Sequence, residues 1–380
     1  MSELYTLPDG WEWKKLAEIV KLQNGFTFKS NLFVSDGLPI VRIKNIKNEK
    51  ILLDDVVYFN MEDYGKKLDS YQIKKNDILI AMSGATTGKI GLYETNTISY
   101  LNQRVGLFRI EDSNLRSYLF YFLSTQIEKN LELSLGAAQP NLSTEQINNI
   151  MLPFPPIEEQ KRIVTKLNNL FTQIDKSIAL HQKNIDEANV FMASVLNDIF
   201  VELEEKYGLK EINSLFKIKS GNFLPAKNMI EDGEINVYGG NGINGKHNEF
   251  NLSGENIIIG RVGALCGNVR CVNDNIWLTD NAFYISEYFE DIDKKFLTQM
   301  LIHIDLGSSA NKSAQPVISY KSICEMTLPL PPLKTQQKVV SYLDEISNKM
   351  EKIKQIQKEK MQSLKALKAS ILDQAFKGEL

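Results

Sequence analysis

The sequence is poor in the residues from which metal sites, disulfide frameworks and many active sites are built. It has only 3 cysteines and 3 histidines in 380 residues. Cys266, Cys271 and Cys324 stand at no spacing typical of zinc ligands, and the histidines are scattered among different segments. These scarcities argue against a disulfide-stapled secreted protein, a metal site and a histidine-based catalytic triad. We expect reduced thiols, no metal and a cytoplasmic location.

Long apolar stretches are also missing. No apolar run reaches the length of about 18 residues that favours a membrane span, and the N-terminal residues do not resemble a secretory signal. A hydrophobic content of 43% and a charged content of 24% are ordinary for globular proteins. The length suits two or three domains, each able to bury its own core. We expect no membrane partner.

A strong excess of basic charge is absent as well. The net charge is −3, made up of −1 for residues 1–145, −1 for 146–200, −5 for 201–316 and +4 for 317–380. No segment has the basic balance of a protein that holds nucleic acid through phosphate contacts alone. Any role in nucleic-acid binding must therefore depend on local patches or on partners.

The chain contains an internal repeat. Residues 137–200 and 313–376, aligned without a gap, share 17 identities in 64 positions. The match begins at Gln139 and Gln315 and includes the junctions LPFPPIEEQKRIV and LPLPPLKTQQKVV. Upstream of each copy, NDILIAMSGATTGKIGLY from Asn76 is similar to ENIIIGRVGALCGNVRCV from Glu255. A duplicated unit of globular domain plus helix explains both similarities.

The two halves have the same predicted organisation. Short β-branched runs broken by Gly, Asn and Asp indicate a mainly β or α+β domain, followed by helical patterns around residues 117–133 and 294–304. We predict an α+β protein in which two globular domains (1–150 and 201–326) alternate with two long helices (151–200 and 327–380). The helices would pack as an antiparallel coiled coil with approximate two-fold symmetry.

Heptad patterns follow both proline-rich junctions, because prolines fix the backbone ahead of a helix and the apolar periodicity then changes to 3 and 4. Each helix would have roughly 40 residues. Both apolar seams become polar at the same place, His181 and Asn184 in one helix and Gln357 and Lys360 in the other. We expect these four residues to face one another and fix the helix register. Solvated side chains are the alternative.

Two stretches resemble catalytic motifs without satisfying them. SGATTGKIG has three residues between Gly84 and Gly88 and an isoleucine after Lys89, whereas a P-loop needs four residues and a Ser or Thr. PDGWEWK contains Asp9, Glu12 and Lys14 but leaves no room for the separate strands of a nuclease core. No methyltransferase motif is visible. We therefore expect no catalytic residues.

The residues that carry a family resemblance are the opening LPDGWEWKKLAEI, the two junctions and the ending SILDQAFKGEL. Together they resemble the specificity (S) subunit of type I restriction-modification systems, over the whole chain. The resemblance implies a non-catalytic subunit whose two target-recognition domains each read one half of a bipartite double-stranded DNA site. It also implies that two helices set the spacing and dock methyltransferase (M) subunits, two in number, joined by restriction (R) subunits. S-adenosylmethionine, ATP and Mg would then lie on those partners, and this chain would carry no cofactor.

Base edges are read by Arg, Lys, Asn and Gln presented from loops and strand ends. For the first domain this chemistry favours Arg42, Lys44, Asn45, Ser83, Thr86, Thr87, Lys89, Asn102, Gln103 and Arg104. For the second it favours Tyr238, Asn241, Asn244, Lys246, Arg261 and Asn281, with a glycine-rich loop that would approach a groove closely.

Two other functions fit the same sequence. One is a coiled-coil interaction scaffold without a nucleic-acid role, which binding assays on random duplexes would distinguish. The other is an enzyme that uses the near-P-loop, which would show ATP turnover lost on Lys89→Ala.

Overall fold

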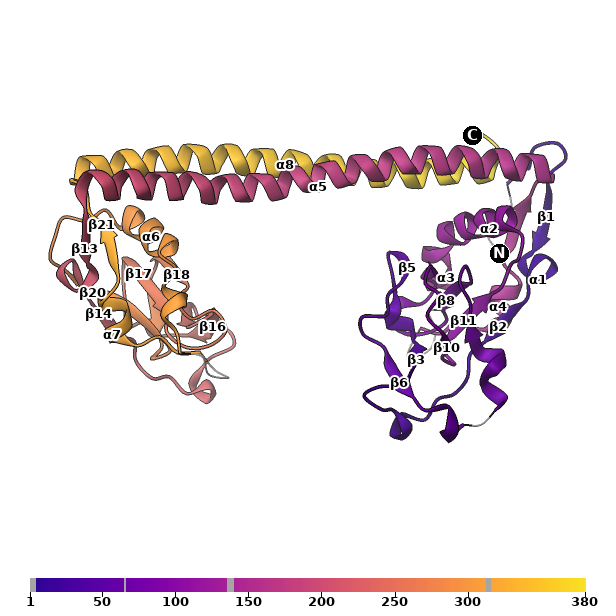
Figure 1. Ribbon diagram of the computed structural model, residues 1–380, viewed down its shortest axis with the longest axis horizontal. Coiled ribbons are helices and arrows are strands. Elements are labelled where there is room, and N and C mark those ends of the chain that lie inside the picture. The colour runs from indigo at the N-terminus through magenta and orange to yellow at the C-terminus, as the bar shows by residue number, and fades with distance from the viewer. Residues whose placement is uncertain (1–4, 65, 135–139, 312–315) are drawn as a thin grey trace. The chain divides into compact units, whose positions relative to one another are not determined.

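The computed structural model describes residues 5–64, 66–134, 140–311 and 316–380, without the side chains of residues 66 and 67 (Figure 1). The repeated Gln139 and Gln315 lie outside the described residues. Contacts divide the chain into two compact units, Met1–Leu180 with Lys360–Leu380 and His181–Glu359. Each unit holds one globular domain and part of both long helices, α5 (Ile157–Tyr207) and α8 (Leu333–Lys377). The predicted α+β class, with two domains alternating with two long helices, is confirmed.

The first unit contains two main sheets. The larger has the order β2-β11-β8-β9-β5-β4 and consists of β2 (Leu22–Asn24), β11 (Val105–Phe108), β8 (Ile78–Ala81), β9 (Ile90–Leu92), β5 (Glu49–Ile51) and β4 (Ile46–Lys47). The smaller has the order β6-β3-β10-β7 and consists of β6 (Val57–Phe59), β3 (Leu38–Val41), β10 (Ser99–Leu101) and β7 (Gln72–Ile73). Residues of β8 are fully buried, as their continuous apolar run predicts.

The helices of the first domain are short. They are α1 (Leu16–Ile19), α2 (Ser113–Thr125), α3 (Ile127–Ser134) and α4 (Thr144–Asn148). The helix predicted around residues 117–133 is two helices, because the backbone tightens at Gln126, whose N–H donates to Leu123 O. Asp112 caps α2 and Ser143 caps α4, each through its side chain.

The second unit repeats this plan with fewer strands. Its larger sheet has the order β14-β20-β17-β18 and consists of β14 (Phe216–Ser220), β20 (Ala282–Tyr288), β17 (Glu255–Gly260) and β18 (Val269–Asn273). Its smaller sheet has the order β16-β15-β19 and consists of β16 (Gly242–His247), β15 (Ile235–Gly239) and β19 (Ile276–Leu278). The helices of this domain are α6 (Lys294–His303) and α7 (Tyr320–Cys324).

Corresponding strands pair in the same way in both domains. The sheet β2-β11-β8-β9 matches β14-β20-β17-β18, and the parallel pair β3–β10 matches the parallel pair β15–β19. The loops after β8 and β17 also match. Gly88 N–H donates to Ala81 O at 2.8 Å, and Gly267 N–H donates to Gly260 O at 2.7 Å. Both glycines have positive φ, which a side chain would strain.

Each proline-rich junction starts as a strand pair and ends as a helix. β1 (Glu12–Lys15) pairs with β12 (Met151–Phe154), and β13 (Leu209–Glu211) pairs with β21 (Thr327–Pro329). The first-turn glutamines Gln160 and Gln336 are 4% and 1% exposed. Each donates from Nε2 to a proline carbonyl five residues earlier, Pro155 at 2.9 Å and Pro331 at 2.8 Å. The repeated glutamine thus closes the backbone where the strand turns into the helix.

The two glutamines differ in how much they hold. Gln336 also accepts from Asp293 N–H at 2.8 Å and donates to Asp291 O at 3.1 Å, so it ties the loop before α6 to the junction. In the first unit a comparable tie comes from Tyr118 of α2, whose hydroxyl donates to Pro153 O at 2.7 Å. Burial raises the pKa of Tyr118, which keeps the hydroxyl a donor.

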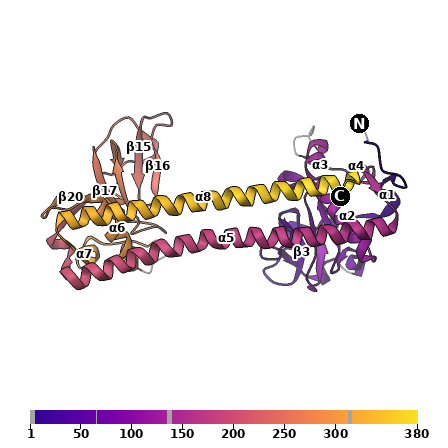
Figure 2. The ribbon, with the colours of Figure 1, turned by 90° about the horizontal axis from the view of Figure 1, so that it is seen from above.

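The long helices run antiparallel within each unit (Figure 2). In the first unit Asp175 pairs with Lys368, and the earlier Arg162 donates to the later Leu380 O. Both helices are longer than predicted, and α5 continues past residue 200 to Tyr207, where Gly208 with a φ of 70° follows. The helices join the domain cores through Ile163, Leu167, Ile371 and Phe376 in the first unit and Leu203 in the second.

The predicted polar layer is only partly on the seam. His181 Nδ1 lies 2.5 Å from Gln357 Oε1, and these residues are repeat counterparts, 176 positions apart. Asn184 is exposed, with its Nδ2 3.4 Å from Gln357 Oε1, and the buried Ile185 takes its place. Lys360 is also exposed, beside the half-buried Met361. An α-helix has 3.6 residues per turn rather than 3.5, so a strict heptad assignment drifts off the contact face.

Replacing the junction glutamines by leucine tests their role. Gln160→Leu leaves Pro155 O without its side-chain donor, and we expect a loss of about 1–3 kcal/mol in unfolding free energy. Gln336→Leu should cost more, because it also removes the acceptor for Asp293 N–H. The measurement is urea unfolding, with Gln355→Leu on the exposed face of α8 as the control, expected within about 0.5 kcal/mol of wild type. Equal stability of all three variants would refute this role.

A double-mutant cycle at His181 and Gln357 tests the seam contact. His181→Leu alone should lower the unfolding free energy by about 1 kcal/mol, because it leaves the half-buried Gln357 amide oxygen with only the long 3.4 Å contact to Asn184 Nδ2. The double variant with Gln357→Leu should recover this loss, since two leucines pack against each other. Thermal or urea unfolding of the four proteins gives the coupling. Strictly additive effects would show that the two side chains do not interact.

Candidate nucleic-acid interface

Three predicted stretches of the first domain converge at the ends of β3, β8 and β10. Asn102 N–H donates to Val41 O at 3.2 Å, and Met82 N–H donates to Arg104 O at 2.9 Å. A Cβ added at Gly84 would stand 3.2 Å from Ile43 Cδ1. The segments that carry the predicted residues around 42, 83 and 103 therefore form one surface.

The accessible polar side chains of this surface differ in how firmly they are held. Lys89 and Arg104 are exposed, and their side chains make no hydrogen bond or ion pair with the described residues, whereas Lys44 forms an ion pair with Asp55 at 2.6 Å. The hydrogen bond from Lys44 lowers the pKa of Asp55. Gln103 Oε1 accepts from Thr27 Oγ1 at 2.6 Å. Partly exposed members of the surface are Arg42, Lys44, Ser83, Thr86 and Asn102.

Two of the predicted residues are buried and already bonded. Asn45 is 1% exposed, accepts from Arg42 N–H, and donates to Leu52 O and Asp55 O. Thr87 is 2% exposed and donates to Gly84 O at 2.7 Å. Their polar atoms hold loops together within the domain, and their assignment as base-reading side chains stays a prediction. Their sequence context could not distinguish these roles.

The predicted residues of the second domain also converge. Arg261 N–H donates to Asn281 O at 2.9 Å, and the Asn241 side chain lies 3.3 Å from where a Gly263 Cβ would be. Asn241 and Asn281 are exposed, and Arg261 is half-buried. The turn after β15, the loop after β17 and the residue before β20 thus meet as their counterparts do in the first domain.

The remaining predicted residues of the second domain lie along the β15–β16 hairpin. Asn244 and Lys246 are exposed and line an open groove of about 510 Å³ together with Met229, Ile230, Asn236 and Ile243. Tyr238 is half-buried against Ile258 and its neighbours. The groove has a largely apolar lining, and Asn244 and Lys246 are among its polar members.

The glycines of this hairpin serve the packing of their own domain. A Cβ on Gly240 would stand 2.3 Å from the backbone oxygen of Val262, which leaves no room for a side chain. A Cβ on Gly239 or Gly245 would meet the movable side-chain ends of Asn244, at 2.1 Å, and Met229, at 2.7 Å. A close approach of this loop to a DNA groove stays a prediction.

Arginines without an acidic partner gather at these surfaces. In the described part of the chain, Arg109 pairs with Asp77 and Arg162 with Glu159, while Arg116 donates to Ile110 O. The other four have no carboxylate within 4.0 Å, and they are Arg42, Arg104, Arg261 and Arg270. Two of these four arginines lie on the surface of each domain.

Arg270 was missed in the sequence because it lies inside an apolar strand pattern, NVRCV. It projects from β18, and its Nη2 donates to Asn241 O at 3.2 Å. Gly242 leaves space for the guanidinium, which lies 3.5 Å from the position of an added Cβ. The signal available in the sequence was an arginine within an apolar strand pattern, where a buried charge would need a partner.

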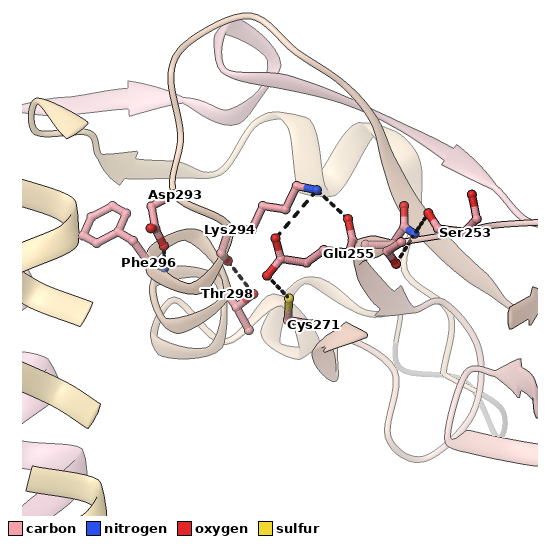
Figure 3. A network of polar contacts seen from close by, with 9 residues as sticks. Ser253, Glu255, Cys271, Asp293, Lys294, Phe296 and Thr298 are labelled. Atoms are coloured by element: carbon pink, nitrogen blue, oxygen red, sulfur yellow. Dashed lines mark hydrogen bonds and ion pairs between the residues drawn. The ribbon is translucent and has the colours of Figure 1, made fainter. Parts of the chain in front are cut away.

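The polar network around Lys294 is structural (Figure 3). Lys294 lies 3.9 Å from Glu255 Oε2, and Cys271 Sγ lies 3.6 Å from Glu255 Oε1, so the network ties α6 to β17 and β18. Burial and Glu255 raise the pKa of Cys271, which keeps the thiol protonated and poorly nucleophilic.

The near-P-loop does not have the surroundings of a nucleotide site. The loop from Ser83 to Lys89 leads into the strand β9, whereas a P-loop opens a helix. Within the described residues, no three His, Cys, Asp or Glu side chains lie close enough together to bind a metal ion. Nor does any helix in that part of the chain have the length and apolarity to cross a membrane.

Comparisons with known proteins agree with this arrangement. Residues 8–189 and 204–360 match the family described as Type I restriction modification DNA specificity domain. The EcoprrI specificity subunit from Escherichia coli is 26% identical over 394 residues, covering 95% of this chain and 94% of that protein. A solved structure from work on assembly and conformational transition of the type I R-M system has a TM-score of 0.75 and 20% identity, covering 99% of this chain and 100% of the other. The HsdS subunit from Thermoanaerobacter tengcongensis gives a TM-score of 0.53 and 21% identity, with 99% of each chain covered.

Proposed function

Since the chain belongs to the type I restriction-modification DNA specificity family and is a DNA sequence-recognition subunit, we propose that each of its two domains reads one half of a bipartite site. The observation that carries this proposal is the recurrence of one polar surface in both domains, built from corresponding loops. Each surface has two arginines free of carboxylates, the side chains best suited to guanine edges and phosphates.

The helix pair would set the number of base pairs between the two half-sites. DNA rises about 3.4 Å per base pair, so a register shift of one helical turn, about 5.4 Å, would change this number by one or two. The His181–Gln357 contact supports a defined register, because a half-buried polar pair disfavours sliding.

The chain itself would be non-catalytic. Its polar clusters are bonded into the fold, and its near-P-loop opens a strand. We propose that methyltransferase subunits supply S-adenosylmethionine chemistry, that restriction subunits supply ATP- and Mg-dependent steps, and that the complex works on DNA in the cytoplasm. The modest charge of this chain fits partners that provide many of the phosphate contacts.

Exposed apolar residues at repeated positions support docking of two copies of one partner. Leu180 and Ile356 are 61% and 52% exposed and stand 176 positions apart, as do Phe191 and Leu367, each 48% exposed. Ile157 and Leu333 form a third such pair. Large apolar side chains at matching exposed positions of both helices are typical of a duplicated protein interface. We propose that the three exposed apolar residues of each helix bind one methyltransferase subunit.

Methylome sequencing tests DNA recognition. Cells carrying this chain with its methyltransferase subunit should show adenine methylation in one bipartite motif, and deletion of the chain should abolish it. Arg42→Ala should weaken binding to that motif by about 1–3 kcal/mol if Arg42 pairs with a guanine. A bipartite motif that persists without this chain would contradict the proposal.

Charge substitutions on the helices test the docking proposal. Leu180→Glu and Ile356→Glu should each remove one methyltransferase subunit, and the double variant should remove both, as native mass spectrometry would show. Lys176→Glu and Lys352→Glu, at matching exposed repeat positions, are the controls and should keep the full complement. If the variant with both Leu180→Glu and Ile356→Glu still binds two methyltransferase subunits, this docking site is refuted.

A further inference from the structure

One backbone position is held identically in both domains. Met82 directly follows β8, donates from N–H to Arg104 O at 2.9 Å and accepts from Leu142 N–H at 2.8 Å. Arg261 directly follows β17, donates to Asn281 O at 2.9 Å and accepts from Ile318 N–H at 2.9 Å. Met82 therefore corresponds to Arg261, and Arg104 corresponds to Asn281.

The side chains on this shared backbone bond differ between the domains. In the first domain Met82 is the donor and Arg104 the acceptor of this backbone bond, and in the second Arg261 is the donor and Asn281 the acceptor. Each pair therefore contains one arginine, which is the acceptor residue in the first domain and the donor residue in the second. Met82 is 8% exposed in the core, while Arg104 and Asn281 are exposed.

The next strand residue explains which partner reaches the surface. Gly106 is the second residue of β11, and a Cβ there would stand 3.2 Å from Met82 Sδ, so the glycine leaves room for methionine to turn inward. Phe283 is the second residue of β20, and the Arg261 guanidinium carbon lies 5.3 Å from the centre of its ring. The ring fills the core and supports the arginine above it.

We propose that this residue pair determines specificity in each domain, with Arg104 binding a guanine of the first half-site and Arg261 a guanine of the second. An arginine that donates to guanine O6 and N7 together is the commonest specific contact in the major groove. This inference rests on the proposed function, and it adds which base is recognised in each half-site and which arginine recognises it.

Guanine suits Arg261 better than phosphate does. Stacking on Phe283 and a long hydrogen bond of 3.5 Å from Nη1 to Asp280 O orient the planar guanidinium. Nη2 and the second hydrogen of Nη1 remain as donors for a ligand in the same plane. The surrounding segment 201–316 carries a net charge of −5, which disfavours a general phosphate clamp.

Binding to duplexes that contain 7-deazaguanine tests the inference, because this analogue keeps base pairing but lacks the N7 acceptor. The complete methyltransferase complex and its methylome-defined motif are used, with one guanine replaced at a time. We expect one guanine in each half-site whose replacement weakens binding on the order of tenfold. Arg261→Ala should abolish this effect in the second half-site only, and Arg104→Ala in the first only.

Two further variants separate base contacts from phosphate contacts. Arg261→Lys keeps the charge but not the paired geometry, so it should lose the 7-deazaguanine effect and retain binding to random duplexes. Arg270→Ala, on the same surface, should weaken binding to all sequences alike, as loss of a phosphate contact would, and retain the 7-deazaguanine effect. The inference is overturned if a half-site has no sensitive guanine, if the effect survives in the alanine variants, or if they weaken binding equally on all sequences. Binding without any bipartite preference would instead refute the proposed function itself.

Discussion

Close approach between backbones, made possible by glycine, is the constraint on which both domains depend. The loop after β8 bonds back to its own strand through Gly88, and the loop after β17 does so through Gly267. In the same loops, Gly84 N–H donates to Pro140 O and Gly263 N–H donates to Pro316 O. Glycines with positive φ or without space for a Cβ occupy these points in both halves. Any side chain there would separate the segments, and with them the polar surface that they form.

The junctions join each domain to the helices by the same principle of satisfied backbone groups. Proline supplies a carbonyl but no N–H, and a buried glutamine amide supplies the donor. Because the amide is removed from water, an unmatched group would cost more than the bond contributes, so the geometry is strongly specified. The unusual repeat of prolines and glutamine thus follows from a single requirement, which arises wherever a strand turns directly into a long helix.

Much of this architecture could be predicted from the sequence, because the repeat aligns loop with loop and helix with helix. Side-chain chemistry in predicted loops singled out Arg42, Asn102, Arg261 and Asn281, but only the folded chain brings their segments together. Patterns of residue type could not separate Gln103, which is exposed, from Asn45, which is buried, since both are amides in polar loops.

Other differences have geometric causes. Heptad positions assigned along a whole helix drift by about 20° per heptad, so Ile185 and Met361 replaced Asn184 and Lys360 at the contact face. Arg270 sits in an apolar strand pattern, and its guanidinium reaches the turn before β16, where it donates to Asn241 O at 3.2 Å. Such placements depend on three-dimensional neighbours that no local pattern encodes.

Positions without room for a side chain alternate with positions that present one. An added Cβ would stand 2.3 Å from Val262 O at Gly240 and 2.2 Å from Gly240 O at Gly260, while the next residues, Asn241 and Arg261, carry polar side chains at the surface. Replacing the exposed Asn241 would alter the chemistry of the surface and leave the close backbone contact beside it intact. Scaffold and surface chemistry are thus divided between adjacent residues, so one can change without the other.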